Sequence, residues 1–92
     1  MDILEQIAWR IIKEQELIIG PLALEEAGRV SGLVLDSANN RVSLNGNKAE
    51  DVDRLVAQYE RIFGKASVQV CRDAATPLLP GLNAAQRPQS LK

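Results

Sequence analysis

The chain has 92 residues, a length that fits one domain and leaves too little sequence for a second core. Hydrophobic residues make up 46% of it and charged residues 25%, which is typical of a globular protein and excludes intrinsic disorder of the whole chain. The formal net charge is −1, so no bulk positive field favours binding to DNA or RNA.

Cysteine usage and hydropathy predict a soluble, cytoplasmic protein. Cys71 is the only cysteine, which excludes an intrachain disulfide and fits a reducing compartment. Residues 1–5 lack the basic segment followed by an apolar one that marks a signal peptide. The apolar run at residues 17–24 contains Gly20 and Pro21 and is far shorter than the roughly 20 residues that cross a bilayer. We therefore expect no membrane contact.

Two helices are expected at the N-terminal end. Asp2 followed by Glu5 is typical of a helix N-cap with its capping-box partner. Apolar residues then recur at helical spacing to about Ile19, which predicts one buried stripe. The stripe comprises Leu4, Ile7, Ile11 and Ile18. Gly20-Pro21 should end this helix, because proline suits the first turn of a new helix better than a helix interior. The second helix is predicted over residues 21–30, with Leu22, Ala27 and Val30 among its buried residues.

A β-hairpin is the best-defined local prediction. Segments 33–38 and 41–45 flank Asn39-Asn40, a pair that tolerates the positive φ angles of a type I′ turn. A loop of those two asparagines would place Leu35 opposite Leu44. One buried face would then carry Leu33, Leu35, Val42 and Leu44, and Val34 would be the only apolar residue on the other face.

One long helix is predicted after the hairpin. Asn47 followed by Glu50 signals a second N-cap. An apolar stripe follows without losing phase at Gly64, and it comprises Val52, Val56, Tyr59, Phe63, Ala66 and Val70. The continuous phase favours a single helix at about residues 48–75, with a bend allowed at Gly64, over two helices joined there. The predicted fold class is therefore α+β, with the order α-α-β-β-α.

The C-terminal segment should leave regular helix at Thr76-Pro77. Leu78, Leu79 and Leu82 follow in a proline-containing segment, and they either fold back on the helices or form an extended docking peptide for another protein. Residues 83–92 are polar and aperiodic, which predicts a disordered tail after a single globular domain at residues 1–82.

The residues that most catalytic and metal sites need are missing. The chain has no histidine, the commonest general base and metal ligand, and no glycine-rich phosphate-binding motif. Asp51 and Asp53 should project on different faces of one helix, and Cys71 beside an apolar stripe should be a small buried hydrophobic residue. We therefore predict no enzyme, no catalytic residue, no cofactor and no metal.

Trp9 is the main candidate for a partner contact. On a helix it lies opposite the apolar stripe, with Ile12 between the two faces. Another part of the monomer covers this ring, or a second molecule does, and tryptophan is enriched in binding hot spots. The predicted partner-binding residues are Trp9, Ile12, Leu78, Leu79 and Leu82.

A row of cations offers a nucleic-acid alternative. Arg54, Arg61, Lys65 and Arg72 would align along one continuous last helix, where they could meet phosphates. Acidic residues lie close to them in sequence, which favours an ordinary solvated helix face.

The leading functional hypothesis is a noncatalytic protein-interaction module, a small regulatory or adaptor subunit. It would act as a homo-oligomer, most simply a dimer, or with a larger protein, and a dimer would support a hairpin that is marginal alone. The alternative is a small DNA-binding transcriptional regulator with a helix-turn-helix-like N-terminal half. Its second helix would contain Arg29 as the only cation, so we expect no nucleic-acid partner.

Overall fold

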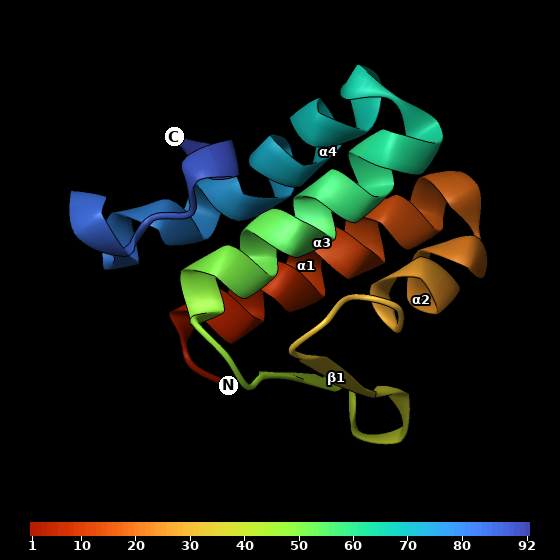
Figure 1. Cartoon of the computed structure of the whole chain (residues 1–92), viewed down its shortest axis with the longest axis horizontal. Helices are drawn as coiled ribbons and strands as arrows, with labels where there is room; N and C mark the ends of the chain where they lie inside the picture. Colours follow the sequence, from red (N-terminus) through yellow and green to blue (C-terminus); the bar gives the residue numbers. More distant parts are fainter.

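The computed structural model describes residues 1–92 and shows an α+β fold that is mostly helical. The elements are α1 (Ile3–Ile19), α2 (Leu22–Ala27), β1 (Leu33–Asp36), β2 (Arg41–Leu44), α3 (Lys48–Phe63) and α4 (Lys65–Ala75). Short 3₁₀ turns at Thr76–Gly81, Ala84–Gln86 and Gln89–Leu91 complete the chain. In Figure 1, α1, α3 and α4 form a bundle, with α2 at one end and the hairpin along one side.

Both predicted N-caps are confirmed. The Glu5 amide donates to Asp2 Oδ1 at 2.9 Å, and the Asp2 amide donates to Glu5 Oε1 at 3.1 Å, which completes the capping box of α1. At the start of α3, the Glu50 amide donates to Asn47 Oδ1 at 3.2 Å. These bonds satisfy helix amides that have no partner within the helix.

The buried stripe of α1 differs from the prediction at its C-terminal end. The core residues of α1 are Ile7, Ala8, Ile11 and Ile12, and none of these side chains is exposed. Gln15 continues the buried face, whereas Ile18 is 63% exposed. The prediction for Ile18 is wrong because the last turn of α1 borders an open groove instead of the core.

The second helix is shorter than predicted and buries fewer apolar residues. α2 ends at Ala27, and Leu22 is 46% exposed although the stripe predicted its burial. Ala27 and Val30 are buried as expected. The buried Tyr59 hydroxyl of α3 donates to the Ala23 carbonyl at 2.7 Å and ties the two helices together.

The hairpin is confirmed, but its turn and register are not. Leu35 pairs with Val42, and Leu44 pairs with Leu33, so the predicted pairing of Leu35 with Leu44 is wrong. The loop runs from Ser37 to Asn40 as a 3₁₀ turn, and only Asn40 has a positive φ, of 54°. This shift moves the pairing by two residues, so the inward and outward faces remain as predicted.

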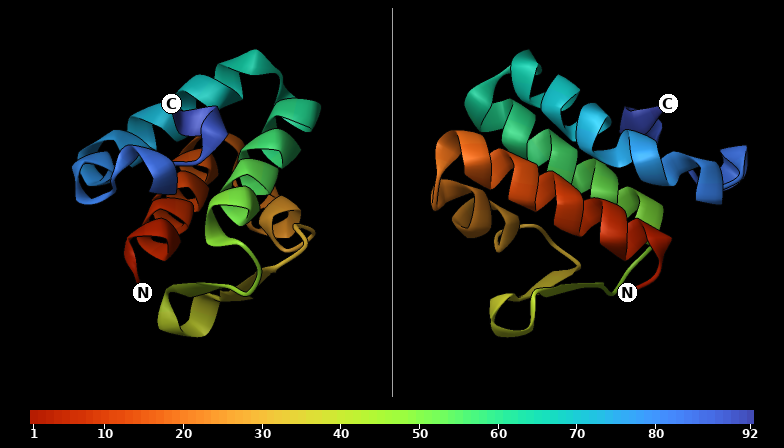
Figure 2. Two further views of the ribbon diagram at one scale, coloured as in Figure 1. Left: turned by 60° about the vertical axis from the view of Figure 1, so that its left-hand side comes forward. Right: turned by 180° about the vertical axis from the view of Figure 1, so that it is seen from behind.

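Gly64 separates two helices, so the prediction of one long helix is wrong. Its φ of 84° and ψ of −176° lie in a region that essentially only glycine adopts. The chain reverses there, and α4 packs back against α3 and α1, as the two views of Figure 2 show. The Ser67 hydroxyl donates to the Gly64 carbonyl at 2.7 Å and stabilises the first turn of α4.

The C-terminal residues pack on the bundle, in contrast to the disordered tail that their composition predicts. The Ser90 amide and hydroxyl both donate to Asp53 Oδ1, at 2.9 and 2.6 Å. Pro88 and Leu91 are buried. A carboxylate on α3 therefore binds the backbone of a segment that looks featureless in sequence.

Candidate protein-interaction surface

Trp9 is covered only in part by its own chain. The ring is half-buried against the core, and the Lys13 ammonium lies 5.4 Å from its centroid. A cation at this distance is attracted to the face of the ring. The role of Trp9 in binding a partner stays a prediction.

The other predicted partner-binding residues lie mostly inside the fold. Ile12 is fully buried, so its predicted place on a partner surface is corrected. Leu82 belongs to the core, and Leu78 and Leu79 are half-buried in the 3₁₀ segment that follows α4. This segment folds back onto α1 and α4, which is the first of the two arrangements expected for it.

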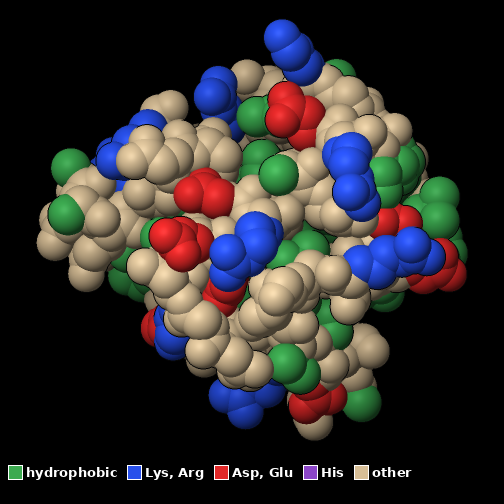
Figure 3. Space-filling model, viewed as in Figure 1, with side chains coloured by type: hydrophobic (Ala, Val, Ile, Leu, Met, Phe, Trp, Pro, Cys, Tyr) green, Lys and Arg blue, Asp and Glu red, His purple; other side chains and the backbone are tan.

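The main exposed apolar surface lies at the other end of the bundle. Its side chains come from the end of α1, the start of α2 and the end of α3, and they are exposed by 81% at Leu17, 63% at Ile18, 46% at Leu22 and 44% at Ile62. Figure 3 shows hydrophobic side chains gathered at the edge of the molecule where these helix ends meet. We call these four residues the apolar end.

A groove of about 270 Å³ runs into the apolar end between α1 and the turn from α3 to α4. Its apolar lining comprises Ile18, Ile19, Phe63, Ala66 and Val70. The Gln15 amide at its base donates to the Ser67 carbonyl at 3.0 Å and to Cys71 Sγ at 3.4 Å. Because this side-chain amide already has partners, the groove offers mainly apolar contact to a ligand.

Two buried ionisable groups of the core, Cys71 and Tyr59, have raised pKa values. Burial raises the pKa of the Cys71 thiol to about 11, so the group stays protonated near neutral pH. Cys71 is fully buried, as its place beside the stripe predicts. Burial also raises the pKa of Tyr59 above its ordinary range. No group of three or more His, Cys, Asp or Glu side chains is arranged to hold a metal ion.

The predicted row of cations is not continuous. Arg54 and Arg61 lie on α3, whereas Lys65 and Arg72 lie on α4, and the reversal at Gly64 separates the two pairs. α2 is six residues long, less than two helical turns, so it presents little surface for reading a DNA groove. None of the helices combines the length and the hydropathy needed to cross a bilayer.

The apolar end has a signal in the sequence that helical periodicity alone does not reveal. Residues 17–19 are three consecutive apolar residues before Gly20, and Ile62-Phe63 precede Gly64 in the same way. One helix face cannot bury consecutive residues, because each residue is rotated by about 100° from the last. Apolar residues in series beside a helix-ending glycine therefore indicate some exposure.

No protein family, curated protein or solved structure matches this chain.

Proposed function

We propose that this protein is a noncatalytic interaction module of the cytoplasm, a small regulatory or adaptor subunit that forms a homodimer through the apolar end. The observation that carries the proposal is that four of the six exposed large hydrophobic residues, Leu17, Ile18, Leu22 and Ile62, lie at helix ends that meet at one end of the bundle (Figure 1). Single exposed apolar residues are ordinary on a soluble protein, but contiguous apolar patches mark interaction sites. Burial of this end would add stability to a chain of only 92 residues.

A second copy is the partner that best suits this surface. The surface combines the strongly exposed Leu17 side chain with a groove lined by Ile18, Phe63 and Val70. In a two-fold interface, Leu17 of each copy can enter the groove of the other, so both copies use the same surface.

The charges around the apolar end do not oppose this association. Lys13 and Glu16 form an ion pair at 2.6 Å on α1, and Lys65 opens α4. Both signs of charge are therefore present near the apolar end. The net charge of the chain is only −1, so two copies repel one another little.

The test is sedimentation velocity over a wide range of protein concentration. The wild-type chain should form a dimer, and Ile18→Asp should weaken it by about 2 kcal/mol or more, as a hot-spot substitution does. The matched control is Val34→Asp, which adds the same charge at a 51% exposed residue on the hairpin. This control should leave the dimer intact.

Two results would contradict the proposal. A wild-type chain that stays monomeric at the highest concentrations would exclude the homodimer. Equal weakening by Ile18→Asp and Val34→Asp would mean that added charge, not the apolar end, controls association. Thermal melting of both variants checks that each remains folded.

A further inference from the structure

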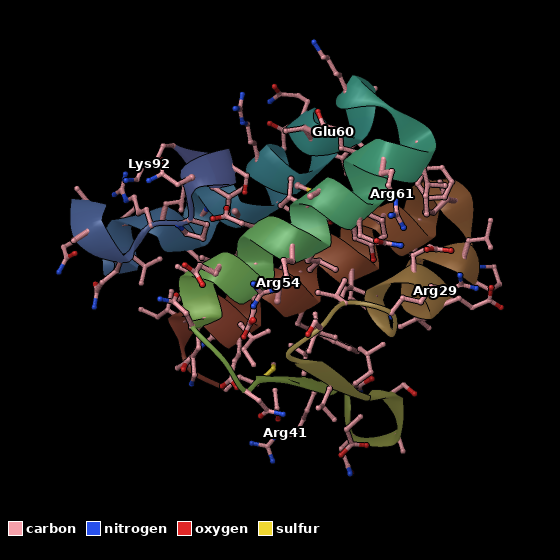
Figure 4. The ribbon with its side chains drawn as sticks, viewed as in Figure 1. Arg29, Arg41, Arg54, Glu60, Arg61 and Lys92 are labelled. Carbon is pink, nitrogen blue, oxygen red and sulfur yellow. The ribbon has the colours of Figure 1, made fainter.

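A separate hollow of about 200 Å³ opens between α3 and the segment that connects α2 to β1. One wall is a face of α3 with helical spacing, formed by Arg54, Ala57, Gln58 and Arg61, and the other wall is formed by residues 29–31. Figure 4 shows the side chains of Arg29, Arg54 and Arg61 on the same face of the molecule. We call this site the arginine hollow.

Arg54 is held in a fixed position at one side of the hollow. Its Nε donates to the Ser31 carbonyl at 3.3 Å, and its guanidinium pairs with the fully buried carboxylate of Asp51. Asp51 also accepts from the Gly46 amide at 3.0 Å. A guanidinium that these contacts already fix loses less conformational freedom on binding a ligand than a mobile one does.

Arg61 and Arg29 retain most of their hydrogen-bond donors. Arg61 donates to Gln58 Oε1 at 3.2 Å. Arg29 forms an ion pair with Glu26, but its Nε lies 3.9 Å from Glu26 Oε2, beyond hydrogen-bond distance. Each guanidinium carries several N–H donors and no acceptor. The hollow is therefore rich in donors that have no acceptor in the protein.

The lining of the hollow includes no carboxylate. Two acids, Asp51 and Glu26, pair with Arg54 and Arg29, and Glu26 also accepts from the Gln58 amide at 2.6 Å. These acids offset part of the positive charge, but both are buried, whereas the side chains of Arg29 and Arg54 are 71% and 46% exposed. A ligand in the opening would meet guanidinium groups first.

The exposed guanidinium groups and the small volume of the hollow indicate which kind of ligand it suits. Guanidinium groups bind phosphate oxygens through paired, charge-assisted hydrogen bonds. The hollow is smaller than the roughly 300 to 1,000 Å³ of sites that enclose a drug-sized molecule. We propose that the arginine hollow binds a single phosphate group, as inorganic phosphate or as the end group of a small phosphomonoester.

The test is an NMR titration of the amide resonances with sodium phosphate, with glycerol 3-phosphate, and with sodium chloride at matched ionic strength. Saturable shifts at residues 29–31 and 54–61 with either phosphate compound are expected, without equal shifts from chloride. Tighter binding of glycerol 3-phosphate would identify a phosphomonoester as the ligand class, and equal or tighter binding of phosphate would identify the free ion. Shifts that do not saturate, or that chloride reproduces, would overturn the proposal.

Three variants localise the binding. Arg61→Gln should weaken phosphate binding about tenfold, because it removes a charged hydrogen-bond donor. Ala57→Leu keeps every arginine and fills the opening, so it should also weaken binding. Arg41→Gln removes the same charge from the hairpin, away from the hollow (Figure 4), and should change the affinity little. If Arg41→Gln weakens binding as much as Arg61→Gln, only the overall charge matters and the site does not exist.

Discussion

At the scale of single residues, three charged side chains join the start of α1 to the hairpin and to α3. Lys48, in the first turn of α3, pairs with the Asp2 carboxylate that caps α1. Glu5 closes the capping box through Oε1 and accepts from the Leu44 amide of β2 through Oε2, at 3.1 Å. The outer edge of β2 is thus bound by a side chain, which reduces its tendency to pair with other strands.

The Asp2 cap should make part of the stability depend on acid pH. Burial alone would raise the pKa of Asp2, but hydrogen bonds from Lys48 and from the Glu5 amide outweigh it and lower the pKa below 3.8. A carboxyl with a lowered folded-state pKa stabilises the protein above its unfolded-state pKa and loses this effect as pH falls through the folded-state value. Asp2→Ala should cost about 1 kcal/mol near neutral pH. The measurement is urea unfolding of both proteins at a series of pH values, in which this cost should shrink below pH 3.8. A cost that stays constant to low pH would mean that the Asp2 charge contributes nothing.

Leu44 tests which face of the hairpin is buried. Its side chain is 3% exposed and belongs to the core, so Leu44→Asp would bury a charge without a partner. The expected loss is roughly 3 kcal/mol or more in the free energy of unfolding. Val34→Asp on the opposite face should cost much less, and chemical denaturation compares the two. Similar losses for both variants would mean that the two faces are not distinguished.

At the scale of elements, Gly64 decides whether α3 and α4 are one helix or two. Its φ of 84° is strained for any other residue, so Gly64→Ala should destabilise the protein by roughly 1 to 3 kcal/mol. In a continuous helix the same change would stabilise it by about 1 kcal/mol, because alanine is the better helix former. The sign of the change in melting temperature therefore distinguishes the two structures. Gly28→Ala is the control, since Gly28 has helical φ and ordinary space for a methyl group. It should be close to neutral.

The elements that the sequence predicts correctly are those determined by residues close to one another along the chain. The caps at Asp2 and Asn47 depend on side chains only three residues from the amides they bind. The two faces of the hairpin follow from alternation along each strand, which is also local. These features are predicted correctly although the turn of the hairpin is not.

The features that sequence misses depend on distant parts of the chain. The apolar stripe that continues in phase across Gly64 predicts burial of Ala66 and Val70, and this prediction is wrong. Ala66 is exposed and Val70 is half-buried, whereas α4 buries Ser67, Cys71, Ala74 and Ala75. Periodicity along the chain does not reveal that the chain reverses at Gly64. Ile18 and Leu22 fit an amphipathic pattern, yet no other element covers them. The order of the last residues comes from Asp53, which is more than 30 positions away in sequence. The arginine hollow likewise combines α3 with the segment before β1.

At the scale of the whole molecule, the two ends of the bundle differ in character. The connections from α1 to α2 and from α3 to α4 meet at the apolar end, whereas the C-terminal turns cover the opposite end (Figure 1). The views from other directions in Figure 2 agree. One end is therefore closed by the chain itself, and the other is left for a partner under the proposed function.

Removal of residues 88–92 tests this division of the molecule. The deletion takes Pro88 and Leu91 out of the core and leaves the Asp53 carboxylate without the Ser90 donors. Burial of one leucine is worth about 1.5 to 3 kcal/mol, so the free energy of unfolding should fall by roughly 2 kcal/mol or more. A disordered tail would instead be removed without any change in the melting temperature. Asp53→Ala, in the full-length chain, should reproduce part of the loss, because it removes only the acceptor.

Neither change touches the apolar end, so sedimentation should show the same assembly state as the wild type while the protein remains folded. Loss of the dimer in the folded, truncated chain would place the interface at the C-terminal end of the bundle instead.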